Sequence, residues 1–387
     1  MIAGKVLVVH NAYVERGGED AVVDCEVGML RRRGHDVREL RLHNELIRGR
    51  ARLGIAIDTV WARSSHRLVG ETVTQFGPDI VHFHNTFPLI SPAGYWAAAG
   101  RRVPTVQTLH NFRLLCPGAL LLRDGGVCED CVGKVPWRAA VHRCYRDSTA
   151  GSGVVATMLV VHRVLGTFHS KVTRYIAFNE FCRDKFIEGG LPGDRIDIKP
   201  NFVDAPAPSD GPRKGILFVG RLSEEKGTTA LLSALNLAPD ITIDVVGSGP
   251  DEVRFRAHPR VRMIGWREPA EVRRRMMEAE MLVVPSIWYE TFGMVAVEAF
   301  ACGLAVVASR VGALASLIRH GETGVLFEPG SAESLVNALR WGLDHREEMR
   351  AMGRNARKEY ERKYTPDTNY SLLCEIYERA MLQGRTS

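Results

Sequence analysis

The sequence predicts an α/β protein built from two doubly wound, Rossmann-like domains that face each other across a cleft. Three observations lead to this fold class. The chain has 387 residues, which is more than one ordinary hydrophobic core needs. Short apolar runs alternate with helical patterns through both halves, as in parallel sheets covered by helices. A proline-rich stretch, 203–212, separates the halves and is typical of an interdomain linker.

Residues 1–203 are predicted to form the N-terminal domain. Its apolar runs are rich in β-branched residues, which favours strands that are buried on both faces of a parallel sheet. The expected strands are Val6–His10, Val37–Leu42, Ile80–His84, Thr105–His110, Tyr175–Asn179 and Ile196–Pro200. The helical patterns between them include Ala21–Arg33 and Phe181–Glu188.

Residues 204–365 repeat the alternation and are predicted to form the second domain. Its expected strands are Ile216–Gly220, Ile241–Gly247, Val261–Gly265, Met281–Pro285, Ala305–Ser309 and Gly324–Phe327. Its expected helices include Thr228–Leu237, Ala270–Glu280, Ala332–His345 and Arg346–Tyr364. The last segment, 366–387, carries one more helical pattern than the second sheet needs. We therefore expect this C-terminal helix to return toward the first domain.

Composition and charge narrow the class of protein. Apolar residues make up 45% and charged residues 25%, as in soluble globular proteins. The N-terminal residues run straight into a strand pattern without a secretory signal, so we expect a cytoplasmic protein with reduced cysteines. Residues 1–203 hold 27 Lys and Arg against 20 Asp and Glu, which favours an anionic partner such as a membrane face or an acidic acceptor. Because aromatic residues do not interleave the basic cluster at 31–33, we expect no nucleic-acid partner.

One stretch, 285–303, predicts the chemistry. A buried strand feeds a polar loop, and Thr291 or Gly293 then opens a short apolar helix that Gly303 can close. The backbone N–H groups at the start of such a helix attract phosphate. The residues that would form this phosphate cradle are Phe292, Gly293, Met294 and Val295.

Two carboxylates flank that cradle, Glu290 on the loop and Glu298 on the helix. Carboxylates accept the hydrogen bonds that sugar hydroxyls donate, so acids beside a phosphate cradle predict a nucleotide-sugar. The alternative is an acidic helix cap followed by a solvated glutamate.

The strand ends of the first domain add two weaker signals. Gly17 and Gly18 precede a helix, where backbone can approach a phosphate closely, although the sequence lacks a dinucleotide-binding G-x-G-x-x-G pattern. His110 follows a strand and is placed to bond a substrate hydroxyl or to orient a leaving group. A plain loop and a core histidine are the corresponding alternatives.

The second domain brings two more such turns. Arg221 and Lys226 bracket the turn after its first strand. Together they can neutralise the charge of a diphosphate, both in the ground state and as it departs as a leaving group. The alternative is a surface turn whose charges pair with Glu224 and Glu225. Gly249, after the next strand, is expected to line a base or ribose, unless it serves only a tight turn.

In this order and spacing, the motifs resemble the retaining GT-B glycosyltransferases of family four (glycosyl transferases group 1). They are Val219-Gly-Arg221-Leu with Lys226-Gly, Val246-Gly-Ser-Gly249-Pro, Pro285-Ser with Glu290-Thr-Phe-Gly293, and the Glu290/Glu298 pair. The resemblance spans nearly the whole chain. It implies a UDP- or GDP-sugar donor held mainly by the second domain, a hydroxyl acceptor held by the first, and no catalytic metal.

The resemblance also assigns roles to single residues. Arg221 and Lys226 would contact the diphosphate, Glu290 the sugar hydroxyls and Glu298 the ribose. Gly18 would meet the phosphates, and His110 would bond the donor sugar. Two sites depart from the family pattern, because Asn111 follows His110 where an aspartate is common, and Asn179-Glu180 stands where a small hydroxyl residue is common. Retention in this family is drawn as same-face attack, which fits the lack of an obvious nucleophile–acid carboxylate pair.

A cysteine-rich loop, 116–144, follows His110. Its cysteines are Cys116, Cys128, Cys131 and Cys144. The C-x-x-C spacing of the middle pair predicts a structural, non-catalytic zinc site, in which His142 is a substitute for one thiolate. Four reduced thiols, or labile disulfides in an oxidising compartment, are the alternatives.

The leading hypothesis is therefore a cytoplasmic, retaining hexosyltransferase of polysaccharide, glycolipid or glycoconjugate synthesis. An apolar stretch, 154–168, suits peripheral contact with the inner membrane face if the acceptor is a lipid, or else is a core helix. Two other functions remain open from the sequence. One is a sugar-nucleotide epimerase on the same architecture, and the other is a zinc-stapled nucleic-acid-binding or scaffold protein.

Overall fold

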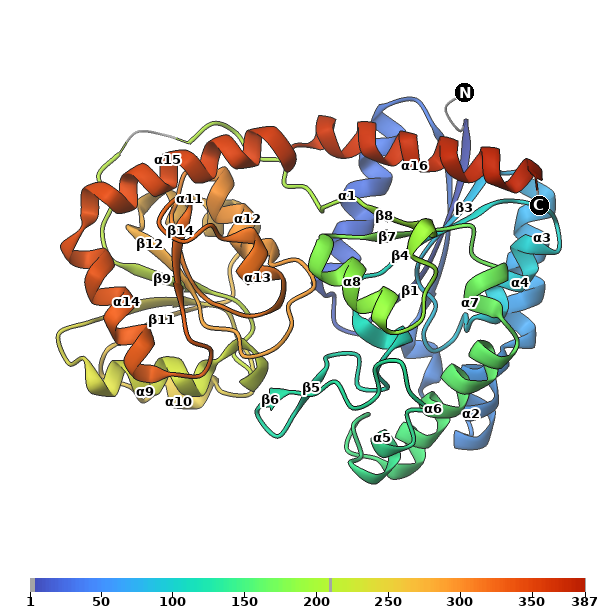
Figure 1. The fold of residues 1–387 in the computed structure, drawn as a ribbon, viewed down its shortest axis with the longest axis horizontal. Coiled ribbons are helices and arrows are strands. Elements are labelled where there is room, and N and C mark those ends of the chain that lie inside the picture. Colours follow the sequence, from blue (N-terminus) through green and yellow to red (C-terminus); the bar gives the residue numbers. More distant parts are fainter. Residues whose placement is uncertain (1–3, 209–210, 387) are drawn as a thin grey trace. The chain divides into compact units, whose positions relative to one another are not determined.

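The computed structural model describes residues 4–208 and 211–386 (Figure 1). The chain divides into two compact units. Unit 1 comprises Met1–Leu121, Glu129–Lys199 and Asn369–Ser387, and unit 2 comprises Leu122–Cys128 and Pro200–Thr368. Ser209 and Asp210 of the expected linker, and the outermost residues of the two terminal segments, lie outside the described residues.

Unit 1 is built on a parallel sheet with the strand order β2-β1-β3-β4-β7-β8. The strands are β1 Lys5–Ala12, β2 Asp36–His43, β3 Ile80–Asn85, β4 Thr105–Thr108, β7 Arg174–Ala177 and β8 Ile196–Ile198. The helices are α1 Gly18–Arg32, α2 Arg52–Trp61, α3 Arg63–Phe76, α4 Ala93–Ala99, α5 Arg138–Val141, α6 Thr149–Val164, α7 Thr167–Ser170, α8 Glu180–Glu188 and, from Asn369 on, α16 Pro366–Thr386. The order reverses between β1 and β3, and ligands of such sheets collect at the carboxyl ends of these strands.

Unit 2 carries a second parallel sheet with the order β11-β10-β9-β12-β13-β14. The strands are β9 Ile216–Val219, β10 Ile243–Val246, β11 Val261–Gly265, β12 Met281–Val284, β13 Val306–Ser309 and β14 Gly324–Phe327. The helices are α9 Thr228–Leu237, α10 Glu252–Arg256, α11 Pro269–Glu278, α12 Met294–Ala301, α13 Gly312–Leu317, α14 Ala332–Asp344 and α15 Arg346–Lys363. The order reverses between β9 and β12, which is therefore the expected ligand side of this unit.

These two sheets confirm the predicted α/β fold class, and one predicted strand end needs correction. The strand expected at Thr105–His110 ends at Thr108, so His110 lies on the loop that follows β4. The cysteine-rich loop contains α5 and a short hairpin of β5 Leu122–Arg123 and β6 Gly126–Val127. At the start of the expected linker, Tyr360 Oη donates a hydrogen bond to the carbonyl of Val203 over 2.9 Å.

A buried ion pair joins the elements of unit 1. Lys199 Nζ, directly after β8, lies 2.9 Å from Glu26 Oε2 on α1, and the two residues are 1% and 2% exposed. The same ammonium group donates to Asn369 Oδ1 on α16 over 3.1 Å. Burial opposes ionisation of Glu26, but the positive charge of Lys199 and contacts with two imidazoles outweigh it and hold the pKa of Glu26 well below its ordinary value. Elements far apart in sequence thus meet at one carboxylate.

This ion pair generates the first prediction. Lys199→Met leaves the Glu26 carboxylate buried without a counter-charge, so the free energy of unfolding of unit 1 should fall by about 3–5 kcal/mol. Urea denaturation followed by circular dichroism measures the loss. The double variant Lys199→Met/Glu26→Leu removes both charges and should regain most of it. Equal instability of the single and double variants would show that the unpaired charge is not the cause.

Candidate functional site

The strand-order reversal of unit 2 brings two predicted residues into contact. Lys226 follows β9, Glu290 follows β12, and Lys226 Nζ lies 2.6 Å from Glu290 Oε1. Ser286 Oγ donates to the same carboxylate oxygen over 2.9 Å. Burial opposes ionisation of Glu290, but the charge of Lys226 and these hydrogen bonds outweigh it and lower the pKa of Glu290. The site therefore holds a carboxylate and an ammonium group side by side at the carboxyl ends of the strands.

The two turns that carry this pair are packed directly on one another. The N–H of Ile287 donates to the carbonyl of Glu225 over 3.1 Å. Gly227 has φ +73°, and a Cβ at this position would lie 1.7 Å from the carbonyl oxygen of Pro285. A side chain here would overlap the end of β12, so glycine is required for the contact between Lys226 and Glu290.

Helix α12 begins beside this pair. Its N-cap, Gly293, has φ +86° and no side chain to cap the first turn. The first-turn N–H groups of Met294 and Val295 have no acceptor within the helix, as at any helix start. Thr291 and Phe292 lead into this turn. The residues of the predicted phosphate cradle thus lie at the start of α12, a few positions after Glu290, and phosphate binding there stays a prediction.

The other predicted residues of unit 2 come from the ends of β9 and β10 and from α12. Arg221 is exposed at the end of β9. Gly249 packs against the backbone of the Arg221 turn, because a Cβ on it would lie 2.4 Å from the carbonyl oxygen of Leu222. Glu298 lies on α12, where burial outweighs the attraction of Arg273 and raises the pKa of Glu298 to about 7.

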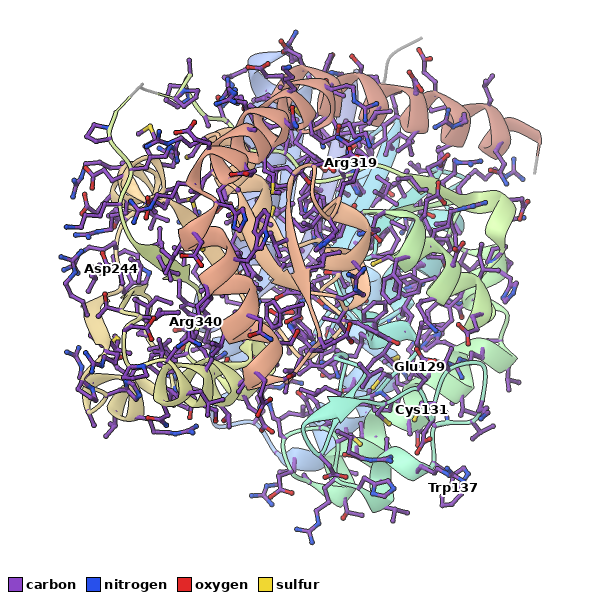
Figure 2. The ribbon with its side chains drawn as sticks, turned by 60° about the vertical axis from the view of Figure 1, so that its left-hand side comes forward. Glu129, Cys131, Trp137, Asp244, Arg319 and Arg340 are labelled. Atoms are coloured by element: carbon purple, nitrogen blue, oxygen red, sulfur yellow. The ribbon has the colours of Figure 1, made fainter. Side chains whose placement is uncertain are left out.

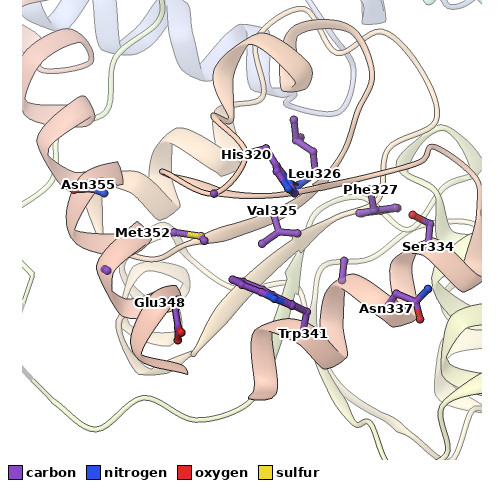
Figure 3. A pocket seen from close by; sticks show the side chains of 13 residues that line it. His320, Val325, Leu326, Phe327, Ser334, Asn337, Trp341, Glu348, Met352 and Asn355 are labelled. Atoms are coloured by element: carbon purple, nitrogen blue, oxygen red, sulfur yellow. Dashed lines mark hydrogen bonds between the residues drawn. The ribbon is translucent and has the colours of Figure 1, made fainter. Parts of the chain in front are cut away.

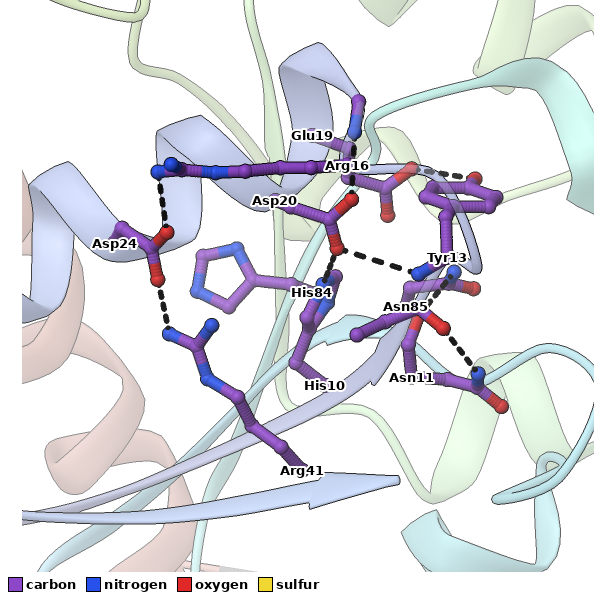
Figure 4. Close-up of polar contacts among 12 residues, drawn as sticks. His10, Asn11, Tyr13, Arg16, Glu19, Asp20, Asp24, Arg41, His84 and Asn85 are labelled. Atoms are coloured by element: carbon purple, nitrogen blue, oxygen red, sulfur yellow. Dashed lines mark hydrogen bonds and ion pairs between the residues drawn. The ribbon is translucent and has the colours of Figure 1, made fainter. Parts of the chain in front are cut away.

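In unit 1, Asp20 organises the turn between β1 and α1 (Figure 4). Its Oδ2 accepts a hydrogen bond from the N–H of Gly17 over 2.8 Å, and its Oδ1 lies 2.8 Å from His10 Nε2. Gly18, the next residue, has open space where a side chain would stand. The sequence identified the glycines but not the buried Asp20–His10 pair that fixes them.

Glu19 adds a carboxyl group to this turn. It accepts hydrogen bonds from Tyr13 Oη over 2.8 Å and from Asn111 Nδ2 over 3.4 Å. Burial outweighs these bonds and raises the pKa of Glu19 to about 8. The carboxyl therefore carries a proton at neutral pH and is a hydrogen-bond donor beside Gly18. This protonation state depends on burial, so no sequence pattern indicates it.

His110 meets a second histidine at the end of β3. His110 Nε2 lies 2.9 Å from His84 Nδ1, and the half-buried His110 ring also packs edge-on against Phe178. Burial lowers the pKa of His110 well below its ordinary value, so the ring is neutral. The sequence predicted His110 as a site residue but overlooked His84, which the H-x-H pattern of β3 (His82 and His84) could have signalled.

The predicted zinc ligands are distributed over both units. A Cβ on Gly118 would lie 3.6 Å from both Cys116 Sγ and Cys144 Cβ, which places these two cysteines side by side. Cys128 ends the hairpin segment of unit 2, and Cys131 lies in unit 1, in a segment whose Trp137 is exposed (Figure 2). The zinc site stays a prediction.

The apolar stretch at 154–168 forms most of α6 and α7. Val155, Met158 and Leu159 form a buried cluster, as expected of a core helix, while Val164 at the end of α6 is 81% exposed. Among the described residues, no helix is long and apolar enough to cross a membrane.

A cavity of about 570 Å³ lies against β14, away from the predicted residues (Figure 3). Trp341 of α14 and Met352 of α15 are among the side chains that line it. Two further lining residues bond the backbone at this sheet edge, since the N–H of Leu326 donates to His320 Nδ1 and the N–H of Glu328 to Ser334 Oγ, each over 3.0 Å. No sequence pattern predicted this cavity.

Comparison with known proteins adds two family matches. "Glycosyl transferases group 1" matches residues 202–359, and "Glycosyltransferase Family 4" matches residues 16–205. Together the two matches cover residues 16–359 and include each residue predicted as a site residue.

Individual relatives agree with these families. The chain is 31% identical over 246 residues to a phosphatidyl-myo-inositol mannosyltransferase of Mycobacterium leprae, covering 59% of this chain and 65% of the relative. A mannosyltransferase of the same name from Mycolicibacterium smegmatis is 29% identical over 84% of this chain and 80% of its own. The crystal structure of Anabaena HepE with UDP-glucose has a TM-score of 0.68 at 20% identity, covering 96% of this chain and 98% of that one. The fold is thus that of GT-B proteins.

The close approach at Gly227 generates the second prediction. Gly227→Ala should lower the melting temperature strongly and reduce the yield of folded protein, because the added carbon overlaps the carbonyl of Pro285. Gly330→Ala is the matched control, since Gly330 has a similar φ of +75° but open space around it. The control should lose only about 1 kcal/mol. Equal losses in the two variants, measured by calorimetry, would contradict the packing argument.

Proposed function

We propose that this chain, which belongs to the group 1 glycosyltransferases, moves a hexosyl unit from a nucleotide-diphosphate-sugar to a hydroxyl group. The observation that carries the proposal is the contact between Lys226 and Glu290 at the strand-order reversal of unit 2, beside the start of α12. The Lys226 ammonium group and the helix N-terminus suit the diphosphate of the donor, which departs with negative charge. The Glu290 carboxylate suits the sugar hydroxyls.

The residues of unit 2 divide this work by their chemistry. The Lys226 ammonium group uses one N–H on Glu290 and keeps two donors for phosphate oxygens. Arg221, exposed at the end of β9, adds a bidentate donor for the same diphosphate. Glu290, already ionised, accepts hydrogen bonds from the hydroxyls of the transferred sugar, and Glu298 accepts those of the ribose.

We propose that transfer retains the configuration of the sugar and needs no metal ion. The acceptor oxygen forms a bond to the anomeric carbon on the face from which the diphosphate departs. The bond from that carbon to the phosphate oxygen breaks with both electrons on the phosphate, which then takes the proton of the acceptor hydroxyl. Lys226, Arg221 and the first N–H groups of α12 stabilise the charge that develops on the departing oxygen.

The acceptor is proposed to be a glycolipid or polysaccharide precursor, because the mycobacterial relatives are named for transfer to a phosphatidylinositol. UDP is one candidate for the nucleotide, since HepE was crystallised with UDP-glucose, and GDP is the other. A lipid acceptor would bring the protein to the inner membrane face. Exposed apolar side chains at the end of α6, Val164 and Leu165, supply a surface for such contact.

Removal of the acid generates the third prediction. Glu290→Gln keeps the shape of the side chain but removes the charge, so the rate of transfer should fall by about 100-fold or more. Radiolabelled product formation from UDP-glucose and GDP-mannose measures the rate. Ser286→Ala is the matched control, because it removes one hydrogen bond to the same carboxylate and keeps the charge. Unchanged turnover of Glu290→Gln would remove this residue from the site.

The raised pKa of Glu298 generates the fourth prediction. Only the ionised carboxylate accepts hydrogen bonds through both of its oxygens. With a pKa of about 7, the ionised fraction of Glu298 rises by about tenfold between roughly pH 6 and pH 8. Affinity for UDP or GDP should therefore increase with pH over this window, as measured by isothermal titration calorimetry.

The control is Glu298→Gln, which cannot titrate. It should bind more weakly at high pH and show only the pH dependence that the nucleotide phosphate contributes. A wild-type protein whose pH dependence matched that of Glu298→Gln would exclude the ribose contact proposed for this side chain.

A further inference from the structure

We propose that Arg113 is the centre of an oxyanion-binding site in unit 1, which holds a phosphate or carboxylate group of the acceptor. The rings of Phe87 and Tyr145 fix its guanidinium group, and in the described part of the chain no carboxylate forms an ion pair with it. The assignment to an acceptor rests on the proposed function, whereas the anion site rests on these contacts alone.

Arg113 lies at the ligand end of the first sheet. It belongs to a short 3₁₀ turn, Phe112–Leu114, that follows β4, and Phe87 follows the neighbouring strand β3. The turn begins at Asn111, whose Oδ1 accepts a hydrogen bond from the N–H of Arg113 over 3.0 Å. Loops that follow neighbouring parallel strands reach the same edge of a sheet, which is where doubly wound sheets bind their ligands.

Two aromatic rings hold the guanidinium group in one orientation. Its central carbon, Cζ, lies 4.4 Å from the centre of the Phe87 ring and 5.1 Å from that of the Tyr145 ring. The ring centres are 5.5 Å apart, and both rings pack on the buried α6 cluster of Val155, Met158 and Leu159. Aromatic rings bind the face of a guanidinium group and leave the N–H groups, which lie in its plane, for hydrogen bonds.

Most N–H donors of this side chain remain unused. Among the described residues, only Nη1 of Arg113 forms a hydrogen bond, to the carbonyl of Pro117. Arg113 is half-buried, and burial outweighs the attraction of neighbouring groups and lowers its pKa. A guanidinium group nevertheless stays charged in proteins. A positive charge that is partly withdrawn from water, with a fork of unused donors, suits an oxyanion that binds through two oxygens.

The carboxyl group of Glu19 acts on Arg113 electrostatically but does not balance its charge. Glu19 lies in the first turn of α1 and accepts a hydrogen bond from Asn111 Nδ2 over 3.4 Å. Burial raises the pKa of Glu19 to about 8 despite the positive charge of Arg113. Glu19 therefore keeps its proton at neutral pH, and a ligand is left to supply the negative charge.

Arg163 of α6 shows what a structural arginine looks like in the same region, and it provides the matched control. Its Nη1 and Nη2 donate to the carbonyls of Lys134 and Leu114 over 2.7 Å and 3.0 Å. Burial lowers the pKa of Arg163 as well. The surroundings of the two arginines are thus similar, but Arg163 has used both ends of its fork on the backbone. Only Arg113 should bind an oxyanion.

The acceptor is the substrate that best explains this charge. In the proposed function, Lys226 and Arg221 of unit 2 already match the diphosphate of the donor. A further cation in unit 1 therefore points to a second negative group, carried next to the hydroxyl that receives the sugar. An acidic acceptor also agrees with the excess of Lys and Arg over Asp and Glu in residues 1–203.

The anion site is tested by ¹H–¹⁵N correlation NMR of the full chain, labelled at the arginine side chains, at neutral pH and constant ionic strength. Arg113→Lys and Arg163→Lys each remove one Nε–H peak and so assign it. Sodium phosphate and sodium glucuronate are titrated separately in exchange for sodium chloride. The Arg113 peak should shift saturably with at least one of them, and the stronger response identifies phosphate or carboxylate. An Arg113 peak that moves no more than the Arg163 peak would overturn the site.

A second measurement decides between acceptor and donor. Isothermal titration calorimetry of UDP and GDP with Arg113→Met should give dissociation constants within about twofold of the wild type. A loss of about tenfold or more beyond that of Arg163→Met would assign the charge to the donor diphosphate and contradict the acceptor assignment. If Arg113→Met does not fold, as judged by circular dichroism, Arg113→Lys takes its place, because it keeps the charge but loses the fork.

The acceptor contact itself is tested with two lipids that differ in one group. Glucuronosyl diacylglycerol carries a carboxylate where glucosyl diacylglycerol carries a hydroxymethyl group. If phosphate gives the stronger NMR response, the pair is phosphatidylinositol and its neutral phosphate methyl ester. With UDP-glucose or GDP-mannose as the donor, the wild-type KM should be about tenfold lower for the charged lipid.

Arg113→Met should abolish this difference in KM, and Arg163→Met should keep it. Equal wild-type KM values for the two lipids would exclude the acceptor contact. If neither lipid receives a sugar while the Arg113 peak responds to anions, the proposed transfer to a glycolipid fails and the anion site stands.

Discussion

The fold of unit 1 depends on one buried charge pair, Glu26 with Lys199. An ionised carboxylate with 2% exposure is tolerated only because an ammonium group lies 2.9 Å away, and that group comes from the far end of the sheet. Lys199 also donates a hydrogen bond to Asn369, and Glu26 contacts His82, which bonds to Tyr377. Polar contacts inside the core therefore hold the C-terminal helix. The other carboxylate oxygen of Glu26 lies 3.3 Å from His84 Nε2, so the same buried charge reaches the end of β3.

Both units place their polar residues by the same rule. A doubly wound sheet leaves a gap in its helical cover where the strand order reverses, and only loops from the two central strands reach it. In unit 2 these loops carry Lys226 and Glu290, which form an ion pair. In unit 1 they carry Gly17 and the end of β3, where His84 lies. Residues separated by dozens of positions in the sequence can therefore meet, as Lys226 and Glu290 do.

The sequence predicted the alternating architecture and named Lys226 and Glu290 as separate site residues, because β-branched runs and turn motifs are local signals. Gly227 and Gly293 were informative for the same reason, since each satisfies a backbone constraint within a few residues. The sequence did not predict that the side chains of Lys226 and Glu290 form an ion pair. Glu26, Lys199 and the raised pKa of Glu19 could not be predicted in this way. Their states depend on burial and on partners far along the chain, and a lone glutamate in a helix is ordinarily a solvated residue. His84 falls between these cases, as its H-x-H spacing was visible but its partner was not.

The edge strand of the second sheet, β14, bears on whether copies of this protein associate at high concentration. β14 ends the sheet, and such a margin ordinarily invites another chain to add a strand. Here the N–H groups of Leu326 and Glu328 are already bound by His320 and Ser334 of the same chain. Side chains thus occupy these two backbone donors, which a strand of a neighbouring molecule would otherwise use to extend the sheet into a continuous ribbon.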